Sequence, residues 1–246
     1  MQNNELLEKL FFELASENRL RILQELQAKN LKMNDVAKKI DLTATEAFRQ
    51  LQRLSNAILV QKQPDGTFAV TGYGRLVLQL SSSYEFVSKH KEYFLSHNVW
   101  NLPVQFINRL GELSNAQLIL DAMDNINKGE KMFIAAKDYA WGIAEGRIPE
   151  LMNPIMDEKI RKGLKIKMII EETLLNKVPP IKMSNVEIRG IKEIPAIMAS
   201  TEKAATMCFR FNNGRLDYGG FYGTDTAFLN WVKDLFEYYW QTAKIR

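Results

Sequence analysis

The chain has 246 residues, enough for two domains, and its 46% hydrophobic and 25% charged content is that of a globular protein with proper cores. A formal net charge of +4 suits a polyanionic partner. Cys208 is the only cysteine, which excludes an intrachain disulfide and fits a reducing compartment. No signal-peptide layout and no apolar run of the ~20 residues that cross a bilayer occur, so we expect a cytoplasmic protein without a membrane partner.

Two amphipathic helices are expected at the start of the chain. Residues 4–14 form the first, with Leu6, Leu10 and Leu14 on one side. Ser16 then begins a second helix, whose apolar positions recur at helical spacing up to Leu26.

The stretch 34–71 has the layout of a winged helix-turn-helix. A short amphipathic helix reaches the Asp41-Leu42 break, and the next helix opens with the capping box Thr43-Ala-Thr-Glu46. The spacing of Ala47, Leu51 and Leu54 predicts that these three side chains face the core. Behind this helix, strands at 59–62 and 67–70 flank a Pro-Asp-Gly turn, which is a strong hairpin signal.

A polar, arginine-bearing second helix of this kind enters the major groove of DNA, and the hairpin forms a wing beside it. Residues 32–75 carry seven basic and four acidic side chains, and so +3 of the net charge of +4. Phosphate neutralisation would use this local excess. We therefore expect a double-stranded DNA partner, contacted by Thr43, Thr45, Glu46, Arg49, Gln50, Arg53, Lys62 and Gln63.

A long helix is expected after the wing. Thr71 caps it, and an apolar stripe runs from Tyr73 through Leu76, Leu80 and Tyr84 towards Val87. Such a helix either forms a dimer seam or packs as a connector. Because specific sites on DNA normally engage two winged domains, we expect a homodimer through this helix and the first one.

The remaining sequence predicts a mixed sheet with helices. Strands are expected at 130–135, 164–170, 186–191, 204–211 and 216–222, with a helix from Asn153-Pro154 and a final helix capped by Thr224. The fold class is thus α+β: a winged helix-turn-helix domain (1–80), a helical connector (81–126) and a C-terminal α/β domain with a mixed sheet (127–246).

Taken together, these segments show a family resemblance. TATEAFRQLQRL and the PDGTFAVTGYGRLVL junction resemble the winged domains of ArsR-type or TrmB-type prokaryotic regulators. The whole layout resembles an archaeal family that joins such a domain to the middle domain of methanogenesis regulatory proteins, with the segment from His97 to Leu113 as its most specific element. One departure is Ile58, which stands where many winged domains place glycine before the first wing strand, and a β-branched residue is disfavoured at positive φ.

Catalysis is not expected. The second domain has the texture of a phospholipase-D-like fold, but neither His90 nor His97 stands in the His-x-Lys motif of those enzymes. The chain up to residue 83 contains no cysteine or histidine, which argues against a metal-sensing site. We therefore predict no enzyme, no catalytic residue, no metal and no cofactor, and we assign His97 to fastening its loop.

The sequence indicates a DNA-binding transcriptional regulator whose C-terminal domain senses a small-molecule effector or a partner. Two alternatives stay open at this point: an architectural, chromatin-type DNA binder and a winged-helix protein-interaction adaptor. Trp100, Tyr139, Trp141 and Arg189 are candidates to line a small-molecule pocket, although nothing in their spacing requires it.

Overall fold

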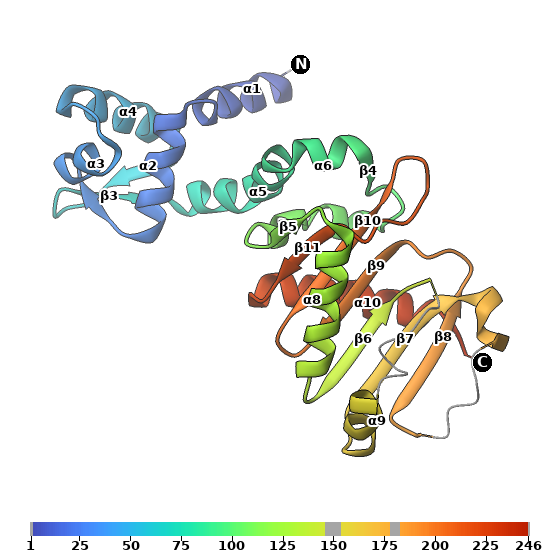
Figure 1. The fold of residues 1–246 in the computed structure, drawn as a ribbon. Coiled ribbons are helices and arrows are strands. Elements are labelled where there is room, and N and C mark those ends of the chain that lie inside the picture. Colours follow the sequence, from blue (N-terminus) through green and yellow to red (C-terminus); the bar gives the residue numbers. More distant parts are fainter. Residues whose placement is uncertain (1, 146–153, 178–182, 246) are drawn as a thin grey trace. The chain divides into compact units, whose positions relative to one another are not determined.

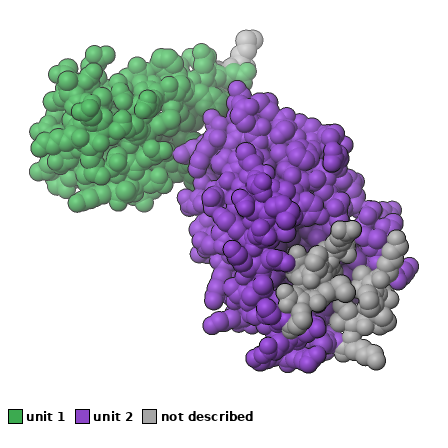
Figure 2. Space-filling model, in the orientation of Figure 1, with its two compact units in different colours: residues 1–81 green, residues 82–246 purple. Residues whose placement is uncertain are grey.

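The computed structural model describes residues 2–145, 154–177 and 183–245 (Figure 1). Contacts between Cα atoms divide the chain into two compact units, residues 1–81 and 82–246 (Figure 2). The first boundary lies one residue from the predicted one. The predicted connector, 81–126, is not a separate element and belongs to the second unit.

The first unit is a winged helix-turn-helix. Its elements are α1 (Gln2–Leu14), α2 (Glu17–Ala28), β1 (Leu31–Lys32), α3 (Met33–Ile40), α4 (Ala44–Asn56), β2 (Val60–Lys62), β3 (Thr67–Val70) and the start of α5 (Gly72–Lys89). The strands form an antiparallel sheet in the order β1-β3-β2. The predicted break between the two central helices is confirmed: Asp41 ends α3 in the left-handed conformation, with φ 59°.

A single core holds this unit together. Ile22, Leu23, Val36, Leu51 and Leu54 are almost fully buried in it. Leu10 and Leu14 pack against the same core, so two of the three α1 residues expected at a dimer seam face inward instead. The exposed apolar side chains of α1 are Leu6, Leu7, Phe11 and Phe12.

The second unit begins with short elements. After the end of α5 come α6 (Lys91–Ser96), β4 (His97–Asn98), α7 (Val104–Ile107), the 3-10 helix η1 (Leu110–Leu113) and β5 (Gln117–Ile119). The main sheet then receives β6 (Tyr139–Ile143), β7 (Lys165–Glu171), β8 (Val186–Ile191), β9 (Ala196–Thr201), β10 (Ala205–Phe211), β11 (Gly220–Gly223) and β12 (Lys244–Ile245). The helices among them are α8 (Ala122–Ala135), α9 (Pro154–Arg161), the 3-10 helix η3 (Glu172–Lys177) and α10 (Thr226–Thr242).

The sheet is mixed, as predicted. Its order is β12-β8-β7-β6-β9-β10-β11-β5, and β4 pairs with β10. Strand β7 lies between β6 and β8 and is parallel to both, whereas every other pairing is antiparallel. Helices α8 and α9 cover one face and α10 the opposite face (Figure 1).

Several local predictions for this unit were wrong. Residues 130–135 lie in α8, because a short apolar run does not distinguish a strand from a buried helix segment. Asp225, not Thr224, caps α10 by accepting a hydrogen bond from the Phe228 amide. Strands β6 and β9 were not foreseen. Asn153, the expected cap of α9, and the expected Pro179-Pro180 loop lie outside the described residues.

The connector segment is part of the core of the second unit. Phe86, Tyr93, Phe106 and Leu113 are buried in the same cluster as Trp231 of α10. The indole Nε1 of Trp231 donates a hydrogen bond to the Phe106 carbonyl over 3.1 Å. A fragment that begins at residue 127 would lack these four core residues. The second unit therefore begins near residue 82.

Ile58 provides a test of strain in the first unit. Its φ is +60° and its side chain is 65% exposed, so the residue keeps a conformation that costs a non-glycine residue about 1–2 kcal/mol. Ile58→Gly relieves this strain and loses little buried area. Part of the gain is offset by the greater freedom of glycine in the unfolded chain, about 0.4–1 kcal/mol.

We therefore expect Ile58→Gly to raise the free energy of unfolding by about 0.5–1 kcal/mol in denaturant titrations. Ile58→Ala is the matched control, because alanine keeps the strain at positive φ. A glycine variant no more stable than the alanine variant would contradict this account.

Candidate nucleic-acid interface

Helix α4 begins with the predicted capping box. Thr43 Oγ1 accepts a hydrogen bond from the Glu46 amide over 3.2 Å, and Glu46 Oε2 accepts from the Thr43 amide and hydroxyl over 3.0 and 2.7 Å. These hydrogen bonds lower the pKa of Glu46. Thr43 and Glu46, both expected to contact DNA, thus direct their side chains to the start of their own helix.

Two further candidate residues turn toward α1 and α2. Arg53 makes two hydrogen bonds to the Glu13 carboxylate, over 2.6 and 3.1 Å, and its guanidinium lies 5.1 Å from the Phe12 ring centre. Gln50 Oε1 accepts a hydrogen bond from the buried Arg19 over 3.2 Å. Both side chains are half-buried, so they hold α4 against the rest of the unit.

The outward face of α4 is a stripe of four exposed residues at spacing i, i+3, i+4 and i+7. We call Thr45, Phe48, Arg49 and Gln52 the α4 stripe. Ala47, Leu51 and Leu54 are buried on the opposite side, as predicted. Phe48 is 53% exposed and was not among the candidates. Its position between Thr45 and Gln52 on one helical face was the signal in the sequence that would have revealed it.

The wing follows the predicted hairpin. The Gln63 amide donates to the Thr67 carbonyl over 2.7 Å, and Gly66 adopts φ +82° in the turn. Asp65 Oδ1 accepts from the amide and hydroxyl of Thr67, which lowers the pKa of Asp65. Lys62 is exposed at the end of β2, and no ion pair of Lys62 occurs within the described part of the chain. The ammonium group of Lys62 is therefore available to a phosphate.

His97 fastens its loop, as the sequence suggested. Its Nε2 lies 2.9 Å from Asp217 Oδ2 and its Nδ1 lies 2.8 Å from the Tyr93 carbonyl. The ring stacks on Tyr93 with centroids 3.7 Å apart, and only 6% of the residue is exposed. An imidazole enclosed in this way has no free face for a substrate.

The residues considered for a small-molecule pocket lie in two separate places. Trp141 packs 4.6 Å from the Tyr139 ring, and Arg189 lies 4.2 Å from the ring of Trp240. Lys167 links the two groups, 5.1 Å from each tryptophan ring. Trp100, 79% exposed, lies in the segment after β4 and makes none of these contacts. The rings of Trp141 and Trp240 thus contact side chains of the chain itself.

The described residues offer neither a metal-binding cluster nor a membrane-spanning helix. No group of three or more His, Cys, Asp or Glu side chains is arranged to hold a metal ion. No described helix is both long enough and apolar enough to span a membrane.

Residues 132–242 match the family model described as the middle domain of methanogenesis regulatory protein FilR1. The solved structures with similarity include TrmBL2, an archaeal chromatin protein, at 15% identity, a TM-score of 0.44 and 98% coverage of both chains. NolR from Sinorhizobium fredii matches at 20% identity and a TM-score of 0.31, over 34% of this chain and 88% of NolR. The winged helix-turn-helix DNA-binding domain of Mb0332 from Mycobacterium bovis matches at 22% identity and a TM-score of 0.33, over 37% of this chain and 84% of the Mb0332 chain.

No curated protein matches the chain. The helix-turn-helix and the wing of the first unit are evident from its own elements. A winged helix-turn-helix with an exposed arginine-bearing helix defines the class of DNA-binding proteins. The family match over residues 132–242 confirms the resemblance of the second unit to methanogenesis-regulator middle domains.

Arg49 is the one arginine of the α4 stripe, and a guanidinium in the major groove pairs with guanine through two hydrogen bonds. We expect Arg49→Ala to cost about 1–3 kcal/mol of binding free energy on a preferred site and to relax base choice at one position. Fluorescence anisotropy on the preferred and a scrambled duplex measures both effects.

Lys62→Ala is the matched control on the wing. A phosphate contact carries no sequence information, so this variant should weaken both duplexes alike and lower the salt slope by about one unit. If Arg49→Ala leaves the ratio of affinities for the preferred and the scrambled duplex unchanged, Arg49 does not contact a base.

Proposed function

We propose that the protein regulates transcription by binding a specific duplex site as a homodimer, with the α4 stripe in the major groove and its second unit sensing an effector or partner. The single observation that carries this proposal is the geometry of α4, whose apolar side is buried while Thr45, Arg49 and Gln52 stay exposed. Thr45 and Gln52 offer hydrogen-bonding groups to base edges, and Arg49 adds the bidentate donor.

Phe48 supplies the apolar contact of the same stripe. A phenyl ring in the major groove packs against the C5-methyl group of thymine, which distinguishes thymine from the other bases. Its exposure in a helix that buries Ala47, Leu51 and Leu54 supports this role.

The proposal includes no catalytic step. His97 is held between Asp217 and Tyr93, and the Cys208 thiol is buried, which raises its pKa. Neither group is exposed as a nucleophile or base.

Selection of bound sequences from random duplex DNA, followed by titration at several salt concentrations, tests the function directly. A specific regulator prefers the selected duplex over random duplex by roughly 10³-fold or more at fixed salt. A ratio near one with a steep salt slope would make the protein an architectural binder, and no duplex binding at all would favour the adaptor role.

Thymine recognition has its own test. Exchanging thymine for uracil in the selected site removes only the methyl group. The loss should be about 1 kcal/mol, near the value of one buried CH₂. We expect the wild-type protein to lose affinity when thymine is exchanged for uracil at one or two positions. The affinity of Phe48→Ala should not change at these positions. Equal losses for both proteins would show that Phe48 does not touch the methyl.

The dimer surface lies on exposed apolar side chains of α1 and α5. Leu6 and Leu7 of α1 are 67% and 50% exposed, and Leu76 and Leu80 of α5 are 53% and 65% exposed. An apolar surface beside a single DNA-binding helix fits a second copy of the chain, because two winged domains related by a two-fold axis reach successive major grooves.

We expect light scattering at micromolar concentration to give twice the 28.4 kDa chain mass. Leu80→Lys should yield a folded monomer with weakened DNA binding, because the charge would be buried at the seam. Glu85→Lys places the same residue on α5 outside the apolar stripe and should leave the dimer intact. A wild-type mass of one chain would refute the dimer.

A further inference from the structure

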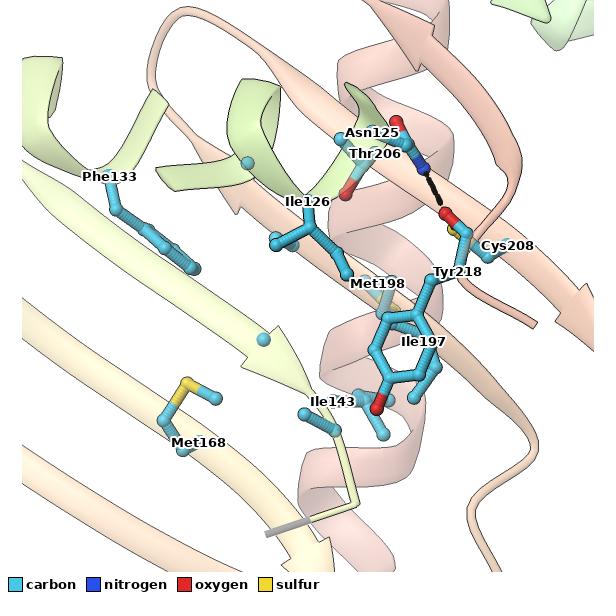
Figure 3. Close-up of a pocket in the computed structure, with 14 residues that line it drawn as sticks. Asn125, Ile126, Phe133, Ile143, Met168, Ile197, Met198, Thr206, Cys208 and Tyr218 are labelled. Carbon is cyan, nitrogen blue, oxygen red and sulfur yellow. Dashed lines mark hydrogen bonds between the residues drawn. The ribbon is translucent and has the colours of Figure 1, made fainter. Parts of the chain in front are cut away.

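A cavity lies between α8 and strands β6, β7, β9 and β10 of the second unit (Figure 3). Its volume is about 90 Å³, several times the roughly 10–15 Å³ that one water needs. Most of its wall is apolar, formed by Ile126, Phe133, Ile143, Met168, Ile197 and Met198.

Gly129 contributes to this open space. It lies inside α8, one turn after Asn125 and one turn before Phe133, and all three line the cavity. A Cβ added at Gly129 would meet no atom within 4 Å. Glycine inside a helix is destabilising relative to alanine, so the sequence forgoes helix stability at a position with room for a side chain.

The cavity also has polar groups with unused hydrogen-bonding capacity. Asn125 is 4% exposed, and its Nδ2 donates to the Tyr218 carbonyl over 2.7 Å and to Cys208 Sγ over 3.1 Å. Its Oδ1 is buried without a partner in the described structure. Thr206 is 5% exposed, and no hydrogen bond of its hydroxyl is found among the described residues. Buried polar groups normally have partners, so a bound molecule with a hydrogen-bond donor would satisfy Asn125 Oδ1, and Thr206 adds a hydroxyl to the same cavity wall.

No Asp, Glu, Lys or Arg side chain lines the cavity in the described part of the chain. Burial raises the pKa of the Cys208 thiol, which therefore stays neutral. A charged molecule would lose its hydration here without gaining an opposite charge.

We propose that this cavity binds a small, uncharged, largely apolar molecule that carries a hydroxyl or similar hydrogen-bonding group, held by Asn125 and Thr206. The regulatory role of that molecule rests on the proposed function, whereas the binding site itself does not.

Phenol is a suitable probe because it is neutral, compact and hydroxylated. Toluene lacks the hydroxyl, and benzoate has a charge at similar size. The full-length protein is labelled with ¹³C at the methionine methyl groups, since Met168 and Met198 line the cavity and Met33 lies in the first unit.

Phenol should shift the Met168 and Met198 resonances and leave Met33 unchanged. Toluene should bind at least about threefold more weakly, and benzoate should leave all three resonances in place. Absence of shifts with phenol up to its solubility, or equal shifts with benzoate, overturns the proposal.

Gly129→Leu fills the cavity and should abolish the phenol shifts. Asn127→Leu is the matched control, because it adds the same side chain at an exposed position of α8. Phenol binding by Gly129→Leu equal to wild type overturns the proposal.

If Gly129→Leu fails to fold, Thr206→Val replaces it, since valine keeps the shape and removes the hydroxyl. Phenol should then lose part of its advantage over toluene, and an unchanged advantage counts against the site. DNA affinity is measured in parallel. If the protein binds DNA but phenol shifts no methionine resonance, only the proposed binding site in the cavity is rejected. If phenol shifts the resonances but the protein binds no DNA, only the proposed regulatory function is rejected.

Discussion

The burial of one side of α4 is the constraint on which the DNA-binding surface depends. Ala47, Leu51 and Leu54 are fully or almost fully buried in the core of the first unit, so rotation of the helix about its axis would expose them to water at a cost of roughly 1.5–3 kcal/mol for each leucine. The same burial fixes which residues face outward. The α4 stripe is therefore a consequence of core packing, and the chemistry of the outward face of α4 follows from three apolar side chains on the opposite face.

Ionic contacts then connect this helix to α1. Glu13 accepts hydrogen bonds from Arg53 of α4, and Arg19 of α2 donates to the Phe12 and Glu13 carbonyls at the end of α1 over 2.7 and 2.6 Å. Arg19 is 6% exposed, and a buried guanidinium is tolerated only when its donors are satisfied. Arg19 thus compensates the free carbonyls that end α1. Because the exposed leucines of α1 belong to the proposed dimer surface, this network links that surface to α4.

Signals contained within a few residues predicted the structure well. The Thr43–Glu46 capping box and the Asp-Gly hairpin were recognisable from sequence because both partners lie within four residues of each other. The roles of Gln50 and Arg53 were not, since their partners Arg19 and Glu13 lie 31 and 40 residues away. The same limit explains residues 81–126: an amphipathic helix reveals that one face is buried, but not which domain buries it.

Two residues depart from local preference, and the departures have different physical meanings. Ile58 is strained at positive φ, yet its side chain lines a groove with Leu6, Phe12 and Tyr73 of the first unit, so a side chain is retained where glycine would be easier. Gly129 is the opposite case, a position without strain where a side chain is absent. Strain and forgone stability persist in proteins where another requirement outweighs them. At Ile58 that requirement is apolar surface beside α1, and at Gly129 it is open volume beside Asn125. The strained Ile58 thus keeps an exposed apolar side chain on the first unit, and Gly129 leaves space inside the second unit.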